Sequence, residues 1–191
     1  MNSWEVLNKL QALGKSWLTL ADLAKVLPVK SQSLNPVVAR LVKKGALKRL
    51  GRGIYTYKGA VVSAESVASQ IYYPSYLSLY TVLSQADLID QIPYEIHLVT
   101  TQKSKRLNLR KTRIFYHQIK PELFFGWRLI DGIPTAEPEK ALVDLMYFAV
   151  LGKAYLNREE LDWRRMNVKK MNRYAKKFPK GVKAAIDAEL K

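Results

Sequence analysis

The sequence predicts an α+β protein with a small N-terminal domain of helices and a hairpin, followed by a larger domain with a mostly antiparallel sheet and a basic helical tail. Three observations predict this: stretches of helical periodicity, stretches rich in strand-forming residues, and a strongly uneven charge. A chain of 191 residues has room for two small domains. We expect their boundary after residue 58, giving domains 1–58 and 59–191.

The charge is unusual in both amount and distribution. Lys and Arg number 32 against 16 Asp and Glu, a formal net charge of +16. Residues 1–58 hold eleven basic and two acidic side chains, residues 59–152 hold nine of each, and residues 153–191 hold twelve and five. Such an excess favours polyanion partners through its summed field. The pattern indicates a basic head, a neutral body and a basic tail.

The first 45 residues contain three segments with apolar residues at helical spacing. The second segment opens at Thr19, and Asp22 three residues later has the spacing of a capping box. The third opens with Asn35 as a cap and Pro36 at the first helical position, and Gly45 is a stop signal. We therefore expect three helices in this part of the chain.

A basic hairpin is expected next, in the stretch GALKRLGRGIYTY. Its turn is Gly51-Arg52-Gly53, and residues 54–57 are rich in strand formers. Alternation in the first arm is imperfect, so the hairpin is better defined than its register. Three helices followed by such a hairpin are the layout of a winged helix-turn-helix, whose third helix enters the major groove of DNA.

We expect double-stranded DNA to contact the third helix, the residues before it, and the hairpin. Gln32, Ser33, Asn35 and Arg40 suit base edges, and the hairpin cations suit phosphates. The complete predicted set is Ser31, Gln32, Ser33, Asn35, Arg40, Lys43, Lys44, Lys48, Arg49 and Arg52. A solvated surface explains Lys43 and Lys44 equally well, and winged helices also bind proteins.

The middle of the chain predicts a second α+β region. PSYLSLYTVLSQADLI has a helical stripe, with Ser75 as its cap. YEIHLVTTQ, TRIFYHQI and LFFGWRLI are rich in strand formers, and Asp131-Gly132 is a tight hairpin signal. PEKALVDLMYFAVLG predicts a long helix with Pro138 in its first turn and Gly152 at its end.

A basic segment, QKSKRLNLRKTR, lies between the first two of these expected strands, and no acid interrupts it. We interpret it as a loop. It is either a second polyanion contact or a solvated segment that prevents aggregation at a sheet edge. Its cations are Lys103, Lys105, Arg106, Arg110, Lys111 and Arg113.

No motif of the sequence predicts catalysis. Cys is absent, and the two histidines, His97 and His117, lie on expected strands as packed or hydrogen-bonded residues rather than metal ligands. The sequence contains no GxSxG, no GxxxxGK[ST] and no GxGxxG. We expect no catalytic residue, no metal site and no cofactor.

The chain is expected to be cytoplasmic, without a membrane partner. The N-terminal MNSWEVLNKL contains Glu5 and no uninterrupted apolar stretch, unlike a signal peptide. The strongest apolar run, ALVDLMYFAVLG, is short and contains Asp144, as expected of a buried helix.

The tail predicts an amphipathic helix in RRMNVKKMNRYAKKF and a further short helix in GVKAAIDAEL. Met171, Tyr174, Ala175 and Phe178 form an apolar stripe, and Lys and Arg occupy the rest of the first helix. The pattern is compatible with a soluble packed helix, with DNA binding or with a membrane-surface helix.

Several blocks together resemble the AbiE-type antitoxin family. They are RLGRGIY after the helix-turn-helix, PSYLSLYTVLSQADLIDQIP, IHLVTT, FYHQIKPELFFGW and AEPEKALVDLMYF, and they occur in the order of that family. The resemblance covers about residues 1–152. It implies an N-terminal winged helix that represses its own operon by binding inverted repeats in the promoter. It also implies a C-terminal region that neutralises a nucleotidyltransferase-like toxin in a type IV system, without a stable complex.

We therefore expect an antitoxin and autorepressor without enzymatic activity, bound as two copies to promoter DNA. The alternative is a stand-alone winged-helix regulator whose C-terminal domain senses a ligand or a partner. From other classes, the body could be an enzyme or an RNA-binding module. A cavity grouping a histidine with carboxylates would favour the enzyme, and preference for structured RNA would favour the RNA-binding module.

Overall fold

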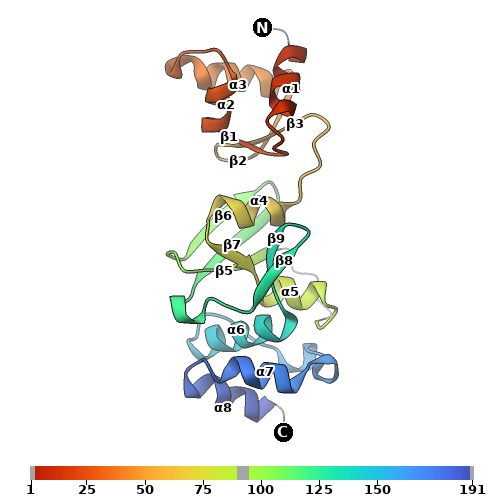
Figure 1. Ribbon diagram of the computed structural model, residues 1–191, viewed down its shortest axis with the longest axis vertical. Helices are drawn as coiled ribbons and strands as arrows, with labels where there is room; N and C mark the ends of the chain where they lie inside the picture. Colours follow the sequence, from red (N-terminus) through yellow and green to blue (C-terminus); the bar gives the residue numbers. More distant parts are fainter. Residues whose placement is uncertain (1–2, 90–94, 190–191) are drawn as a thin grey trace. The chain divides into compact units, whose positions relative to one another are not determined.

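The computed structural model describes residues 3–89 and 95–189, with helices and sheets in both parts of the chain (Figure 1). The mixed α+β class is therefore confirmed. Contacts divide the chain into two units. The head unit comprises residues 1–63 with 108–111, and the body unit comprises residues 64–107 with 112–191.

The head unit combines helices with a three-stranded sheet of order β1-β3-β2 (Figure 1). Its core gathers apolar side chains from the helices and the sheet, among them Leu10, Leu23, Leu41 and Leu47. The elements are α1 (Ser3–Ala12), β1 (Leu18–Thr19), α2 (Leu20–Val26), the 3₁₀ turn η1 (Ser31–Ser33), α3 (Leu34–Lys43), β2 (Leu47–Gly51) and β3 (Ile54–Tyr57).

The start of α2 confirms the expected capping box. The N–H of Asp22 donates to Oγ1 of Thr19 at 3.1 Å, and the N–H of Thr19 donates to Oδ2 of Asp22 at 2.9 Å. Nζ of Lys15 also lies 2.7 Å from the carboxylate. Desolvation raises the pKa of Asp22, but the hydrogen bonds from Lys15 and Thr19 outweigh it and lower the pKa to about 2.

Helix α3 begins earlier than expected. Ser33 stands at the N-cap position instead of Asn35, because η1 runs directly into the helix and the N–H of Leu34 donates to the carbonyl of Ser31. Pro36 then lies in the first turn, where N–H groups have no helical partner and proline is tolerated. Gly45 follows the helix with φ of +72°, as a C-terminal stop requires.

The hairpin contains a bulge that explains its imperfect alternation. Residues 47–49 pair in register with residues 55–57, and the register then shifts between Arg49 and Gly51. As a result Leu47 and Leu50 are both buried although they are three residues apart. Gly53 in the turn has φ of +72°, a conformation that favours glycine.

The body unit is built on a six-stranded sheet of order β6-β7-β5-β4-β9-β8. The sheet is mixed, because β5 pairs with β7 in parallel, as β4 does with β9, so the expectation of a mostly antiparallel sheet is confirmed only in part. β4 with β5 and β8 with β9 are antiparallel. The strands are β4 (Ser75–Leu77), β5 (Glu95–Thr100), β6 (Lys105–Leu109), β7 (Thr112–Gln118), β8 (Trp127–Ile130) and β9 (Ile133–Ala136).

The prediction of a helix beginning at Ser75 was wrong for its first turn. Residues 75–77 form β4, between β5 and β9, and all three side chains are buried. A strand paired on both sides satisfies its backbone groups and buries both faces, so tertiary pairing outweighs the helical spacing. The helix α5 (Leu79–Gln85) begins only after it.

The segment QKSKRLNLRKTR was wrongly interpreted as a loop. Its middle forms β6, which is an edge strand of the sheet. An edge strand is exposed to solvent and tolerates polar, basic residues. Its sequence therefore lacks the apolar pattern from which a strand is predicted. The helix α4 (Ala64–Ile71) and the two-residue β1 were also not predicted.

Helices cover both faces of the body sheet. On β7, the hydroxyl of Tyr116 donates to the carbonyl of Ala68 in α4 at 2.7 Å, whereas the ring of the next residue, His117, lies 5.2 Å from that of Phe148 in α6 (Pro138–Val150). Neighbouring strand residues point to opposite faces, so α4 and α6 cover different faces.

The tail folds as two helices, α7 (Val168–Ala175) and α8 (Lys180–Glu189), next to α6 (Figure 1). Met171, Ala175 and Phe178 are buried, which confirms the apolar stripe. The described residues also include short 3₁₀ turns at Pro121–Leu123, Arg158–Glu160 and Trp163–Arg165. In the described part of the chain, no helix combines the length and the apolar character needed to cross a membrane.

Candidate nucleic-acid interface

Helix α3 presents a polar and basic surface because its apolar residues pack into the core. Val38 and Leu41 are buried, whereas Asn35, Arg40 and Lys43 are exposed. At 100° per residue, Arg40 and Lys43 lie opposite the buried pair. Asn35 lies about 140° from Arg40 around the helix, so the exposed amide and the two exposed cations stand on different sides of α3, and neither Arg40 nor Lys43 is among the residues lining the hollow described next.

A hollow lies between α3 and the hairpin, which we name the α3–hairpin hollow. Its lining residues are Leu20, Asn35, Val38, Ala39, Val42, Arg49, Arg52, Gly53 and Tyr55. Those of α3 follow the i, i+3, i+4, i+7 spacing of one helical stripe. Arg49 and Arg52 are exposed, so two arginines line the same hollow as Asn35.

Lys48 lies elsewhere. It lines a second hollow of the head unit, together with Gly45, Tyr57 and Lys58. Strand alternation explains this separation, because Lys48 and Arg49 are consecutive residues of β2 before the bulge and point to opposite faces of the sheet. The structure therefore joins Arg49 and Arg52 to α3, and it separates Lys48 from them.

The remaining predicted DNA-contacting residues flank α3. Ser31, Gln32 and Ser33 form η1 at its N-terminal end, and all three are exposed. Lys43 ends the helix and Lys44 is its C-cap. Ala39, an exposed residue of the hollow, was missed by the sequence reasoning. Its position four residues after Asn35, hence on the same helix face, was the available signal.

The second basic set does not share one face. Its six cations are exposed, but Nζ of Lys105 lies 4.7 Å from the ring centre of Tyr72, and Cζ of Arg106 lies 5.3 Å from that of Phe115. Neighbouring residues of β6 thus lean towards different faces of the sheet. Arg113 forms an ion pair with Glu95 at 2.5 Å. Of the set Lys103, Lys105, Arg106, Arg110, Lys111 and Arg113, Lys105 and Arg106 therefore lie towards different faces, and Arg113 is paired with a carboxylate.

The body unit contains a buried ionic cluster, which we name the Lys140–Asp144 cluster. Lys140 and Asp144 form an ion pair one turn apart on α6, and both are fully buried. The hydroxyls of Tyr76 and Ser78 donate to Asp144 at 3.0 and 2.9 Å. Desolvation raises the pKa of Asp144 and lowers that of Lys140.

Aromatic rings complete the surroundings of Lys140. Its Nζ lies 4.9 Å from the ring centre of Phe125 and 5.0 Å from that of Phe178. Its aliphatic stem lies so close to Gly126 that a Cβ there would stand 2.9 Å from Cγ of Lys140. The cluster is thus packed and enclosed, and its arrangement suits stability of the body rather than access by a substrate.

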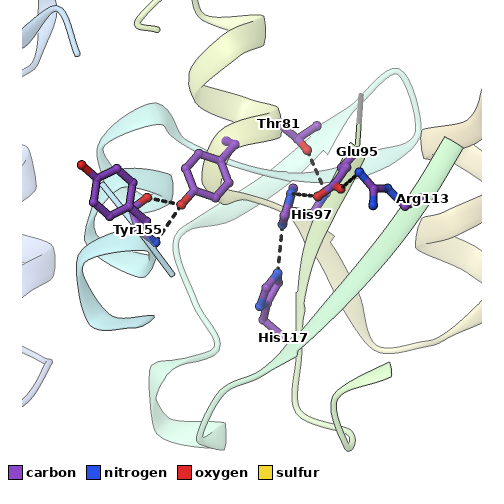
Figure 2. A network of polar contacts seen from close by, with 7 residues as sticks. Thr81, Glu95, His97, Arg113, His117 and Tyr155 are labelled. Carbon is purple, nitrogen blue, oxygen red and sulfur yellow. Dashed lines mark hydrogen bonds and ion pairs between the residues drawn. The ribbon is translucent and has the colours of Figure 1, made fainter. Parts of the chain in front are cut away.

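A second buried polar group joins the two histidines (Figure 2). Nδ1 of His97 lies 3.0 Å from Nε2 of His117, and Nε2 of His97 lies 3.4 Å from Glu95. Burial and the neighbouring His117 lower the pKa of His97 to about 3, and burial with Arg106 nearby lowers that of His117 to about 4. Both rings are therefore neutral at pH 7, consistent with packed strand residues.

Across residues 3–89 and 95–189, the His, Cys, Asp and Glu side chains form no group of three that could hold a metal ion. Figure 2 shows the two imidazoles directed at each other, with Thr81 and Arg113 nearby. One imidazole therefore donates to the other.

The basic tail is partly neutralised inside the body unit. Nζ of Lys170 in α7 lies 2.9 Å from Glu137 and 3.5 Å from Glu139. The hydroxyl of Tyr174 donates to Glu137. Lys169, Arg173, Lys176 and Lys177 remain exposed. The tail thus joins α6 through ion pairs while keeping cations in solvent.

Comparison with known families gives a match within the head unit. Residues 5–58 match the family model described as "Transcriptional regulator, AbiEi antitoxin". The resemblance found in the sequence is thereby confirmed for this segment, which is similar to antitoxin-type transcriptional regulators. No curated protein matches the chain.

Proposed function

We propose that the chain is a winged helix-turn-helix repressor of its own promoter and the antitoxin of a type IV toxin–antitoxin system. The observation that carries this proposal is the coincidence of the family match at residues 5–58 with the exposed cations of α3 and the hairpin. The three helices, the small sheet and the basic turn have the order of a winged helix. No catalytic role is assigned to the chain.

On DNA, α3 would lie in the major groove and the hairpin would follow the neighbouring backbone. Arg49 and Arg52 would hold a phosphate at the α3–hairpin hollow, since both guanidinium groups border it. Asn35 and Arg40 would meet base edges, with Gln32 and Ser33 at the entrance of the helix. Lys43 and Lys44 would add phosphate contacts at its other end.

Two copies would bind the inverted repeats that the resemblance implies, one on each half-site. In the same proposal, the body unit counteracts a nucleotidyltransferase-like toxin without forming a stable complex. The exposed cations of β6 and of the tail are available for a second contact with a polyanion. The site of action is the cytoplasm, where the promoter is reached.

The test is binding to the DNA upstream of the chain's own reading frame and to a random duplex, over a salt series. We expect sequence preference and a steep fall of affinity with salt, because each neutralised phosphate contributes about 0.9 to the slope of log K against log salt. Asn35→Ala should reduce the preference by about 1–3 kcal/mol, since a base contact is lost. Equal and weak binding to both duplexes would refute the repressor.

A second candidate is a stand-alone regulator whose body senses a ligand or a partner. The limited extent of the family match favours it, because the match ends at residue 58 and leaves the body unit outside. The two candidates differ in the adjacent reading frame. A neighbouring gene for a nucleotidyltransferase-like toxin, whose toxicity this chain suppresses on co-expression, supports the antitoxin. Variants of the body unit that change this suppression without changing DNA binding would separate the two roles.

A further inference from the structure

The two edges of the body sheet differ sharply in chemistry. At one edge, β6 exposes Lys105 and Arg106, charges that discourage pairing with another strand. At the other edge, every side chain of β8 is exposed, and three of the four are large and apolar. Trp127, Leu129 and Ile130 are 40%, 66% and 42% exposed. A short apolar edge of this kind is an open pairing surface.

The backbone N–H and carbonyl of Leu129 in β8 are oriented so that they can pair with another strand. Leu129 stands opposite Pro134 of β9, which has no N–H to donate. The pair is therefore of the non-hydrogen-bonded type, and the N–H and carbonyl of Leu129 point to the free edge. Trp127, two residues away, has the same orientation.

Ring contacts and a tight turn also fix the place of β8 in the body sheet. The ring of Trp127 stacks on that of Tyr76 at 6.3 Å and meets Phe124 at 6.0 Å. Asp131 and Gly132 have φ of +50° and +77°, the geometry of a tight type I′ turn that sets the register of β8 on β9. A preformed strand loses little conformational entropy on pairing.

We propose that β8 pairs antiparallel with β8 of a second copy of this chain, with the two-fold axis at Leu129. This register brings Leu129 against Leu129 and Arg128 against Ile130, so no like charges stand directly opposite. Charge favours contact through this region, because residues 59–152 hold equal numbers of basic and acidic side chains whereas the head and tail repel their own copies. The strand is only four residues long, so the dimer is weak.

The test is sedimentation of the full chain without DNA, at concentrations from about 1 µM to about 300 µM, where weak dimers dissociate. We expect a concentration-dependent monomer–dimer equilibrium. Leu129→Lys places two ammonium groups face to face and should raise the dimer Kd by about tenfold or more. Leu129→Pro removes the edge N–H but no bond to β9, and it should also weaken the dimer.

Val61→Lys is the matched control, because Val61 is 93% exposed and lies in the head unit. It adds the same charge and should leave the dimer Kd unchanged. A wild-type monomer at every concentration overturns the proposal, as does a dimer that survives both Leu129 substitutions. A monomer whose Leu129→Lys variant loses binding to another protein would assign the edge to that protein and also overturn it. Since no DNA is present, failure here is distinct from failure of the proposed repressor.

Discussion

The charged residues of the α3–hairpin hollow and those of the Lys140–Asp144 cluster differ in their exposure to solvent. In the head unit, Arg49 and Arg52 are exposed, and the Nε of Arg49 donates to the nearby carbonyl of Gly51 at 3.2 Å. In the body unit, Lys140 and Asp144 have no exposed surface and are bonded to each other and to Tyr76.

The difference teaches where a partner is expected. A cation that awaits a phosphate stays hydrated until the phosphate arrives, so it contributes little to folding. A buried ion must be fully satisfied inside the protein, because an unpaired buried charge is strongly destabilising. Substitutions at the first site should therefore alter binding, and substitutions at the second should alter stability.

The largest effect should come from breaking the buried pair. Asp144→Ala leaves Lys140 buried without its anion, and we expect a loss of about 3–5 kcal/mol in the free energy of unfolding, measured with urea. The double variant Lys140→Met/Asp144→Leu removes both charges at similar volume but leaves the hydroxyls of Tyr76 and Ser78 without their acceptor, so it should recover only part of that loss. A loss under about 1 kcal/mol for Asp144→Ala would contradict a structural role for the pair.

The histidine pair should make the body unit sensitive to acid. The folded pKa values, about 3 for His97 and about 4 for His117, lie below the ordinary 6.5. Between pH 6.5 and about 4 the unfolded chain therefore binds more protons, and stability falls as the pH falls. The slope should reach about 1.4 kcal/mol per pH unit for each histidine.

The measurement is urea unfolding between pH 7.5 and pH 5, above the range in which Asp22, with its pKa of about 2, begins to contribute. His117→Phe removes one of the two titrating groups and should lessen the slope. An unchanged slope in that variant would mean that the acid sensitivity arises elsewhere.

The hairpin offers a matched pair of substitutions that sharpens the comparison. Arg49→Ala should reduce the slope of log K against log salt by about 0.9, because one phosphate contact is lost. Lys48→Ala removes an adjacent cation on the opposite face of β2 and should leave the slope nearly unchanged. Equal effects of the two substitutions would show that DNA binding depends on net charge rather than on the α3–hairpin hollow.

The smallest effect should come from the helix cap of the head unit. Thr19→Ala removes the acceptor for the N–H of Asp22 and should destabilise the head by about 1 kcal/mol in thermal unfolding. Lys15→Ala removes only an exposed partner of Asp22 and should change stability by less than about 0.5 kcal/mol. Comparable losses would indicate that the ion pair, rather than the cap, anchors α2.

Local signals predicted the elements that local chemistry determines. Thr19 with Asp22 located α2, and Asp131-Gly132 located the turn between β8 and β9. Proline and glycine bounded α6, which runs from Pro138 to Val150. In each case the decisive residues lie within a few positions of the element that they define.

Other features depend on partners distant in the sequence. Ser75–Leu77 forms a strand because two other strands flank it, and its residues resemble the helix that follows. The i, i+4 spacing of Lys140 and Asp144 was visible, but a charged pair on a helix is usually solvated, and its burial depends on Tyr76, 64 residues away. The separation of Lys48 from Arg49 required the register of β2, which the bulge concealed.

The position of β4 between β5 and β9 also governs when the two units are completed during synthesis. The hairpin of the head pairs residues 47–51 with 54–57, whereas Leu77 of β4 pairs with Thr135 of β9. The body sheet thus has a higher contact order and cannot close until residue 135 has left the ribosome. The helices and hairpin of the head emerge first, so the nascent chain presents its basic surface before the body sheet exists.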